Sequence, residues 1–144
     1  MITIEDLVEY HLPRLTQVSV QPVQGLGFAE ALRATLRQDP DVILVGEIRD
    51  EETAQIAFKA ALTGHLVLAT LHTNNTLSCL QRLENLGVER ALIVDTLLLA
   101  LSQCLVRSAV GGRLPVYELL RLDEILQDRL RLCFLHGLGD IITC

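Results

Sequence analysis

Short apolar runs alternate along the chain with segments in which apolar residues recur at helical spacing. The run at residues 41–46 is continuously apolar after Asp41, and the run at 65–71 is similar, which is typical of strands buried on both faces. Between them, residues 51–62 have helical periodicity, and Asp50 stands where a helix N-cap is expected. Further strands are expected at 1–5 and 16–20, and further helices at 28–38 and from Asn74 or Asn75 to Leu86.

The alternation of strands and helices predicts βαβ units and a mainly parallel sheet. Beyond residue 88, the apolar segment 89–101 is expected to be helical and 108–113 to form a turn. A strand at 114–120 and an amphipathic helix at 122–135 are expected to follow, whereas residues 137–144 carry little signal. The fold class is therefore α/β.

Composition fits one domain whose core is built from aliphatic side chains. Half of the 144 residues are hydrophobic but only 3% are aromatic, so Leu, Val, Ile and Ala must fill the interior. The formal net charge is −6, and no strongly basic stretch offers a track for phosphates. A nucleic-acid partner is therefore not expected.

Membrane spans and metal-binding cysteines are also not expected. The longest apolar stretch, residues 91–101, contains Asp95 and is too short to cross a bilayer. Acidic residues near the start argue against a secretory leader. No C-x-x-C pair occurs, so the cysteines are expected to be reduced cytosolic thiols; they are Cys79, Cys104, Cys133 and Cys144.

Polar residues gather next to the expected strands, where parallel sheets bind ligands at their carboxyl ends. The three groups are Glu5 with Asp6, residues 46–50 (GEIRD), and His65 with residues 72–74. We expect a ligand site where these groups meet.

Each of these residues has two interpretations. Glu47 directly follows a buried strand, so it is either an acid opening a turn or a carboxylate that organises Mg²⁺ or polarises water. Glu5 and Asp6 are adjacent, so their side chains should diverge, and a solvated acidic turn is the alternative to a site.

The histidines and arginines also have two interpretations each. His65 and His72 should point to opposite faces of a strand, which argues against a shared metal, and each is either a phosphate contact or an ordinary core or surface histidine. Arg33 and Arg37 are four residues apart on one helix face and either reach a phosphate or a neighbouring subunit, or form a solvated stripe.

Several segments together resemble the type II secretion and type IV pilus ATPases, the secretion traffic ATPases. They are TIEDLVEY at 3–10, GLGFAEALRATLRQDPDVILVGEIRD at 25–50, ETAQIAFKAALTGHLVLATLHTN at 52–74 and RLENLGVE at 82–89. The resemblance implies an incomplete RecA-like P-loop NTPase core with the aspartate box, Walker B motif and histidine box in residues 1–107. Residues 108–144 would be a truncated C-terminal segment with a short helical remnant.

The resemblance also implies function. Members form hexameric rings that couple ATP hydrolysis, with Mg²⁺, to secretion or pilus assembly at inner-membrane platform proteins, so a cytoplasmic location beside the inner membrane is implied. Glu5 and Glu47 would be catalytic. The residues implied near nucleotide or Mg²⁺ are Asp6, Glu9, Gly46, Arg49, His65 and His72.

The chain departs from the family pattern at several points. It contains no G-x-x-x-x-G-K-[ST] phosphate-binding loop, Leu7 stands where the family has Pro, and residues 108–112 replace a four-cysteine zinc module. Residues 134–144 do not resemble the family's C-terminal helices. We therefore expect the chain alone not to turn over ATP, and its sheet to expose an apolar edge or face. The alternative is a non-catalytic module, or gene remnant, that docks on a full-length motor.

Overall fold

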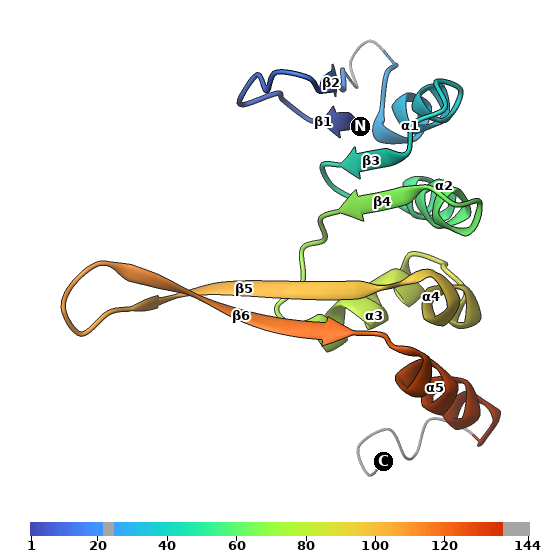
Figure 1. Ribbon diagram of the computed structural model, residues 1–144, viewed down its shortest axis with the longest axis vertical. Helices are drawn as coiled ribbons and strands as arrows, with labels where there is room; N and C mark the ends of the chain where they lie inside the picture. Colours follow the sequence, from blue (N-terminus) through green and yellow to red (C-terminus); the bar gives the residue numbers. More distant parts are fainter. Residues whose placement is uncertain (22–24, 137–144) are drawn as a thin grey trace. The chain divides into compact units, whose positions relative to one another are not determined.

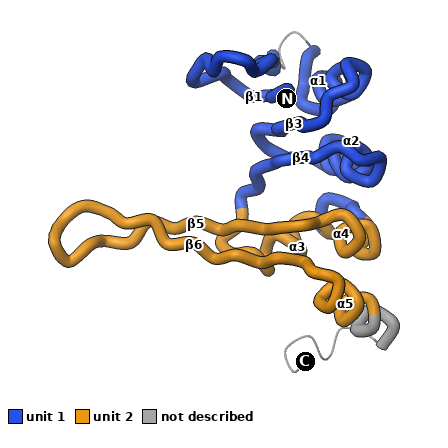
Figure 2. Tube along the Cα trace, viewed as in Figure 1, with its two compact units in different colours: residues 1–72, 85–88 blue, residues 73–84, 89–144 orange. Residues whose placement is uncertain are grey.

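The computed structural model describes residues 1–21 and 25–136 of the chain. These residues form two compact units (Figure 2). The first unit comprises Met1–His72 and Asn85–Val88, and the second comprises Thr73–Glu84 and the described part of Glu89–Cys144. The β-hairpin around residue 107 belongs wholly to the second unit.

A four-stranded parallel sheet forms the centre of the first unit (Figure 1). Its strand order is β2-β1-β3-β4, and all three neighbouring pairs are parallel. The fold class is thus α/β, as expected. The strands are β1 (Ile2–Glu5), β2 (Thr16–Ser19), β3 (Val42–Val45) and β4 (Leu66–Ala69), and the helices are α1 (Phe28–Leu36) and α2 (Glu51–Leu62).

One face of this sheet is packed more tightly than the other. Ile43 and Val45 are fully buried, whereas their neighbours on β3 are only half-buried, so burial alternates with the pleat. Ile4 is the register partner of Val45 and is also fully buried, which places it on the same face. Both α1 and α2 contact the sheet, and their buried residues complete the core.

Strand β4 is less buried than its apolar sequence suggests. The prediction of a strand buried on both faces is wrong here, since Leu66 and Leu68 keep 46% and 43% of their surface exposed. Within the described residues β4 pairs on one side only, with β3. The expected apolar edge is confirmed by these two leucines.

Helix α2 starts at a side-chain cap that fixes the loop following β3. Asp50 Oδ1 accepts a hydrogen bond from the Thr53 amide at 2.7 Å, and Asp50 Oδ2 accepts one from Thr53 Oγ1 at 3.1 Å. Thr53 is fully buried, so both donors depend on this carboxylate. The cap sets where α2 begins relative to Glu47, three residues earlier in the chain.

Replacing Asp50 by alanine is expected to lower the free energy of unfolding by about 1–2 kcal/mol, because a cap is lost and a buried hydroxyl loses its partner. Urea denaturation followed by circular dichroism measures this. Glu89→Ala is a matched control, since Glu89 is the N-cap of helix α4 (Arg90–Thr96) but its side chain makes no hydrogen bond to the helix. Equal stability of the two variants would contradict the role given to Asp50.

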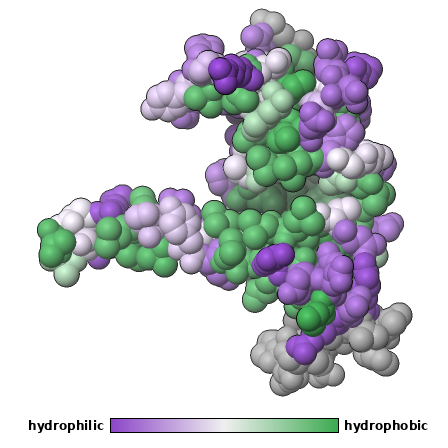
Figure 3. All heavy atoms as spheres, viewed as in Figure 1, coloured by the Kyte–Doolittle hydropathy of each residue, from purple (hydrophilic) through white to green (hydrophobic). Residues whose placement is uncertain are grey.

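The second unit contains a long antiparallel hairpin and three helices. The hairpin joins β5 (Leu99–Arg107) to β6 (Arg113–Arg121), and the helices are α3 (Thr76–Asn85), α4 (Arg90–Thr96) and α5 (Glu124–His136). Exposed hydrophobic side chains lie along the hairpin (Figure 3). In the described residues no helix is long and apolar enough to cross a membrane.

Two sequence predictions for this unit have different outcomes. The expected turn at 108–113 and the strand after it are confirmed by the hairpin. The expected helix over 89–101 is wrong beyond Thr96, because Leu97 has extended backbone angles and Leu99 begins β5. A continuous apolar run does not distinguish the two structures, and pairing with β6 decides in favour of a strand.

Candidate active site

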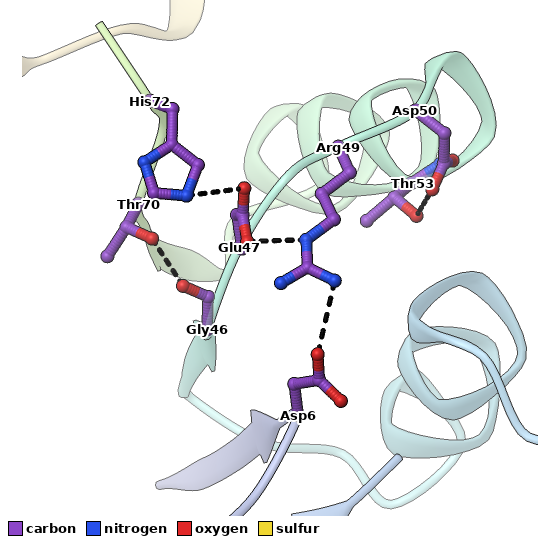
Figure 4. Close-up of polar contacts among 8 residues, drawn as sticks. All are labelled: Asp6, Gly46, Glu47, Arg49, Asp50, Thr53, Thr70 and His72. Atoms are coloured by element: carbon purple, nitrogen blue, oxygen red, sulfur yellow. Dashed lines mark hydrogen bonds and ion pairs between the residues drawn. The ribbon is translucent and has the colours of Figure 1, made fainter. Parts of the chain in front are cut away.

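The carboxyl ends of β1, β3 and β4 bring a set of polar side chains together (Figure 4). Because the three strands are parallel neighbours, the residues that follow them meet at one edge of the sheet. Asp6 follows β1, Glu47 follows β3, and His72 follows β4. Asp6 of the group after β1 and Glu47 of the group after β3 are thus joined through Arg49.

Glu47 lies at the centre of this group. Its side chain is only 13% exposed, and both carboxylate oxygens have partners. Arg49 Nε donates to Glu47 Oε2 at 2.5 Å, and His72 Nε2 lies 3.0 Å from Glu47 Oε1. His72 itself is 90% exposed, so its ring is free to exchange Glu47 for another acceptor. The carboxylate is thus fixed in position yet reachable.

Arg49 connects the segment after β3 with the segment after β1. Its Nη1 donates to Asp6 Oδ2 at 3.1 Å while its Nε contacts Glu47. Hydrogen bonding to Glu47, assisted by its charge and by Asp6, raises the pKa of Arg49, which therefore stays cationic. Two carboxylates and one fixed positive charge face one another at the sheet edge.

The backbone that carries Glu47 is tied to both neighbouring strands. The Gly46 amide donates to Ile4 O at 2.7 Å, and Ile48 N donates to Thr70 O at 3.0 Å. Thr70 Oγ1 donates in addition to Gly46 O. A Cβ on Gly46 would lie 2.9 Å from Ile4 O, so the close approach of β1 and β3 here requires glycine. These contacts fix the position of Glu47 relative to β1 and β4.

Glu5 turns away from Asp6, as the alternation along an extended chain predicts. Glu5 Oε1 accepts hydrogen bonds from Thr3 Oγ1 at 2.5 Å and from Gln17 Nε2 at 3.1 Å. Its carboxylate therefore lies over the face of β1 and β2, whereas Asp6 pairs with Arg49.

A cavity of about 720 Å³ connects the two carboxylate positions within the first unit. Glu5 and Glu47 both line it, and its other walls include Tyr10 and Phe28. Glu9 lies in the loop that forms one side, and its side chain is exposed. Glu5 and Glu47 therefore border the same open space.

His65 is not part of this group, so its expected place with His72 is wrong. His65 precedes β4, and its Nδ1 lies 3.1 Å from Ala60 O and 3.3 Å from Thr63 Oγ1. The next residue, Leu66, donates its amide to Asp41 O just before β3. His65 is thus at the amino ends of the strands, a full strand length from His72.

The two arginines of α1 lie on the helical surface of the unit. Arg33 forms an ion pair with Glu52 of α2, which raises the pKa of Arg33. Arg37 is the C-cap residue of α1. Neither lines the cavity that holds Glu5 and Glu47.

The residues at the sheet edge fit a magnesium ion that is held mainly by phosphates and water. Mg²⁺ in nucleotide sites typically takes one or two protein carboxylates, and Glu47 and Asp6 supply oxygen donors of that kind. No group of three or more His, Cys, Asp or Glu side chains that could hold a metal occurs among the described residues.

Neither Cys79 nor Cys104 lines the cavity of the first unit. Cys79 is half-buried, and burial raises the pKa of its thiol, while Cys104 is exposed. Cys144 and the side chain of Cys133 lie outside the described structure.

Three residues of the site were not singled out by the sequence. Thr70 and Thr3 contact the carboxylate-bearing segments, and Gln17 contacts Glu5. Gln17 and Thr3 are register partners, so they share a face of the sheet. The sequence shows that these two side chains share a face only once the pairing of β1 with β2 is known.

Comparisons with known proteins find relatives of the chain among secretion and pilus assembly proteins. The model of the family described as "Type II/IV secretion system protein" matches residues 1–128. The type IV pilus assembly ATPase PilB of Thermus thermophilus is 61% identical over 105 residues, which are 73% of this chain and 12% of that protein. The type II secretion system protein HxcR of Pseudomonas aeruginosa is 57% identical over 107 residues, or 74% of this chain and 23% of that protein.

The same likeness holds in three dimensions. A crystal structure of the pilus retraction motor PilT with bound ADP superposes with a TM-score of 0.82 at 38% identity, covering 94% of this chain and 42% of that one. The chain therefore spans less than half of that motor and at most a quarter of the two relatives.

Proposed function

The chain belongs to the type II/IV secretion system protein family, and from this premise we propose that its first unit carries the carboxylate part of an ATP-hydrolysing site. The motor would power type II secretion or type IV pilus assembly. The observation that carries the proposal is the meeting of Glu47 with Arg49, Asp6 and His72 at the carboxyl ends of three parallel strands.

Glu47 is the residue best placed to act on the attacking water. Its carboxylate is nearly buried and held from both sides, so its position is set before substrate arrives. A carboxylate in this place accepts a proton from, or orients, a water molecule that attacks the terminal phosphate of ATP. Glu5, which lines the same cavity, would serve as the second carboxylate of the reaction.

The neighbouring residues would organise charge around the phosphates. Magnesium, when bound with ATP, would neutralise phosphate charge near Asp6 and Glu47. His72 is exposed at the end of β4 and offers a donor to the terminal phosphate, and Arg49 bridges the carboxylates of Glu47 and Asp6. Gly46 permits the close strand approach on which this arrangement depends.

Phosphate binding itself would have to come from another segment. The 144 residues contain no G-x-x-x-x-G-K-[ST] sequence, and Lys59, the single lysine, is exposed on α2. A phosphate-binding loop contributes backbone N–H donors and a lysine that Glu47 and its neighbours cannot replace. The chain by itself is therefore proposed to be inactive, and its residues to work when a phosphate-binding loop is present.

The purified 144-residue chain is expected to show no Mg²⁺-dependent ATP hydrolysis above the rate of its Glu47→Gln variant, because both lack a phosphate-binding loop. Release of inorganic phosphate measures this. Turnover by the unaltered chain that the variant loses would contradict the proposed division of the site.

A chimera tests whether the residues themselves are competent. In it, the 105-residue segment of the Thermus thermophilus PilB that matches this chain is replaced by the corresponding residues of this chain. The chimera is expected to hydrolyse ATP, since the rest of that protein, an ATPase by its name, supplies the missing part of the site.

Assembly and location follow the same family proposal. The motor would act as a ring of identical subunits at the cytoplasmic side of the inner membrane, bound to platform proteins of the secretion or pilus machinery. The relatives include both pilus assembly and type II secretion proteins, and the proposal covers both systems.

A second candidate function is favoured by the exposed β4 edge. Leu66 and Leu68 offer an apolar edge through which the chain would dock on a full-length motor and alter its activity without catalysis of its own. Mixing the chain with the PilB relative should then lower the ATPase rate of that protein. An unchanged rate without co-elution would reject docking.

A further inference from the structure

One side-chain amide, that of Gln17 on β2, makes three hydrogen bonds beside the cavity. Its Oε1 accepts from the Leu12 amide at 2.8 Å. Its Nε2 donates to Glu5 Oε1 at 3.1 Å and to Tyr10 O at 3.0 Å. A flipped amide would oppose donor to donor and acceptor to acceptor, so the network itself fixes the orientation of Gln17.

The strand register explains why Gln17 reaches Glu5. Gln17 pairs with Thr3 across parallel strands β2 and β1, so both side chains stand on the same face as Glu5, two residues beyond Thr3. Thr3 Oγ1 and Gln17 Nε2 both donate to the same oxygen of Glu5. Thr3 is 3% exposed, so one of these two donors is held in place by the packing around it.

The same amide anchors the connection between β1 and β2. Residues 6–15 join two adjacent parallel strands without a helix, although such a connection commonly takes about a dozen residues or more. The segment is largely exposed, with Tyr10 at 78% and Leu12 at 53%. Gln17 binds the backbone of both residues and so ties this loop to the sheet.

The loop and Glu5 line the same cavity, and Gln17 contacts both. We propose that Gln17 is a positioning residue that couples loop 6–15 to Glu5, so that the carboxylate has its working position only while the loop is anchored. This inference rests on the proposed function, which gives Glu5 a part in ATP hydrolysis. Gln17 itself touches no reacting atom and acts through Glu5.

Three substitutions of Gln17 distinguish its contact with loop 6–15 from its contact with Glu5. Gln17→Ala removes all three hydrogen bonds, and Gln17→Leu removes them while keeping much of the side-chain volume. Gln17→Glu keeps an acceptor for the Leu12 amide but places a carboxylate against Glu5 and Tyr10 O in place of a donor. Gln55→Ala is the matched control, because Gln55 Nε2 also donates to a loop carbonyl, Gly87 O, at 2.6 Å but does not line the cavity.

The first measurement uses the 144-residue chain and amide hydrogen exchange by NMR. The Leu12 amide is expected to exchange about tenfold faster or more in Gln17→Ala and Gln17→Leu, because the bond that protects it is gone. Gln17→Glu and Gln55→Ala should keep its protection. Unchanged exchange of Leu12 in both apolar variants would overturn the anchoring role.

The second measurement uses the chimera and steady-state ATP hydrolysis. Gln17→Ala and Gln17→Glu are each expected to lower kcat about ten- to a hundredfold with little change in KM for ATP, as misplacement of a catalytic group does. Gln55→Ala should leave kcat unaltered. Gln17→Glu is the sharper variant, since it spares the Leu12 bond and disturbs Glu5.

The outcomes separate this inference from the proposed function. If the chimera with unaltered residues fails to hydrolyse ATP, the proposed function fails, and the exchange data on Leu12 still decide the anchoring role of Gln17. If the chimera is active and kcat survives both Gln17 variants, the coupling to Glu5 is overturned while the proposed function stands.

Discussion

Replacing Glu47 by glutamine in the chimera is expected to lower kcat for ATP hydrolysis about a hundredfold or more while ATP still binds. Glutamine keeps the shape of the side chain and an acceptor for Arg49, but it cannot take a proton from water or carry the charge that faces Mg²⁺. Loss of a positioned general base typically costs on the order of 10²–10⁴ in rate. Steady-state phosphate release gives kcat, and fluorescence titration with a labelled nucleotide gives affinity.

Glu30→Gln serves as the matched control for this substitution. Glu30 lies in the first turn of α1 and accepts a hydrogen bond from the Gly27 amide at 3.1 Å, which a glutamine oxygen can also accept. This variant should keep the kcat of the unaltered chimera. A Glu47→Gln chimera whose kcat stays within about threefold of the unaltered one would contradict the role given to Glu47.

Substitution of Gly46 by alanine is expected to lower the free energy of unfolding by about 1–3 kcal/mol, the usual cost of forcing an added carbon into a filled space. The new Cβ would meet Ile4 O at 2.9 Å and Glu5 Cα at 3.4 Å. Both are backbone atoms of the β1 end, and relieving the contact would stretch the 2.7 Å bond from Gly46 N to Ile4 O. Urea denaturation of the 144-residue chain measures the loss, and Gly46→Val should be worse.

Gly27→Ala distinguishes this steric effect from a general cost of replacing glycine. A Cβ on Gly27 would meet only the end of the Glu30 side chain, at 2.8 Å, and that flexible carboxylate can move aside. Moving it gives up the hydrogen bond that Glu30 accepts from the Gly27 amide, so the Gly27 variant should lose about 1 kcal/mol at most. If Gly46→Ala were as stable as Gly27→Ala, the close approach of β1 and β3 would not be what requires glycine.

Many strands and helices of the first unit could be predicted because short sequence patterns within each segment indicate them. The continuous apolar run at residues 41–46 and the acidic cap at Asp50 mark β3 and the start of α2 by side-chain chemistry alone. Exposure of β4 was not predictable in the same way. Whether an apolar strand is central or lies at an edge depends on its neighbours, and Leu66 and Leu68 have the same side chains in either case.

The residues of the candidate site likewise include some that the sequence could predict and some that it could not. Residues directly after parallel strands meet at one edge for reasons of topology, which is why Asp6, Glu47 and His72 could be grouped from the sequence. His65 was misplaced because it precedes its strand and so lies at the other end of it. Gln17 was missed because its contact with Glu5 depends on the register between β1 and β2, which no local sequence pattern indicates.

The most direct measurement is ATP hydrolysis by the chimera that carries the unaltered residues of this chain, compared with the Thermus thermophilus PilB relative in the presence of Mg²⁺. Carboxylates already in working position should give the chimera a kcat within about tenfold of that relative. A chimera that folds and binds ATP, yet releases phosphate no faster than its Glu47→Gln variant, would contradict the proposal that this chain carries the carboxylate part of the site.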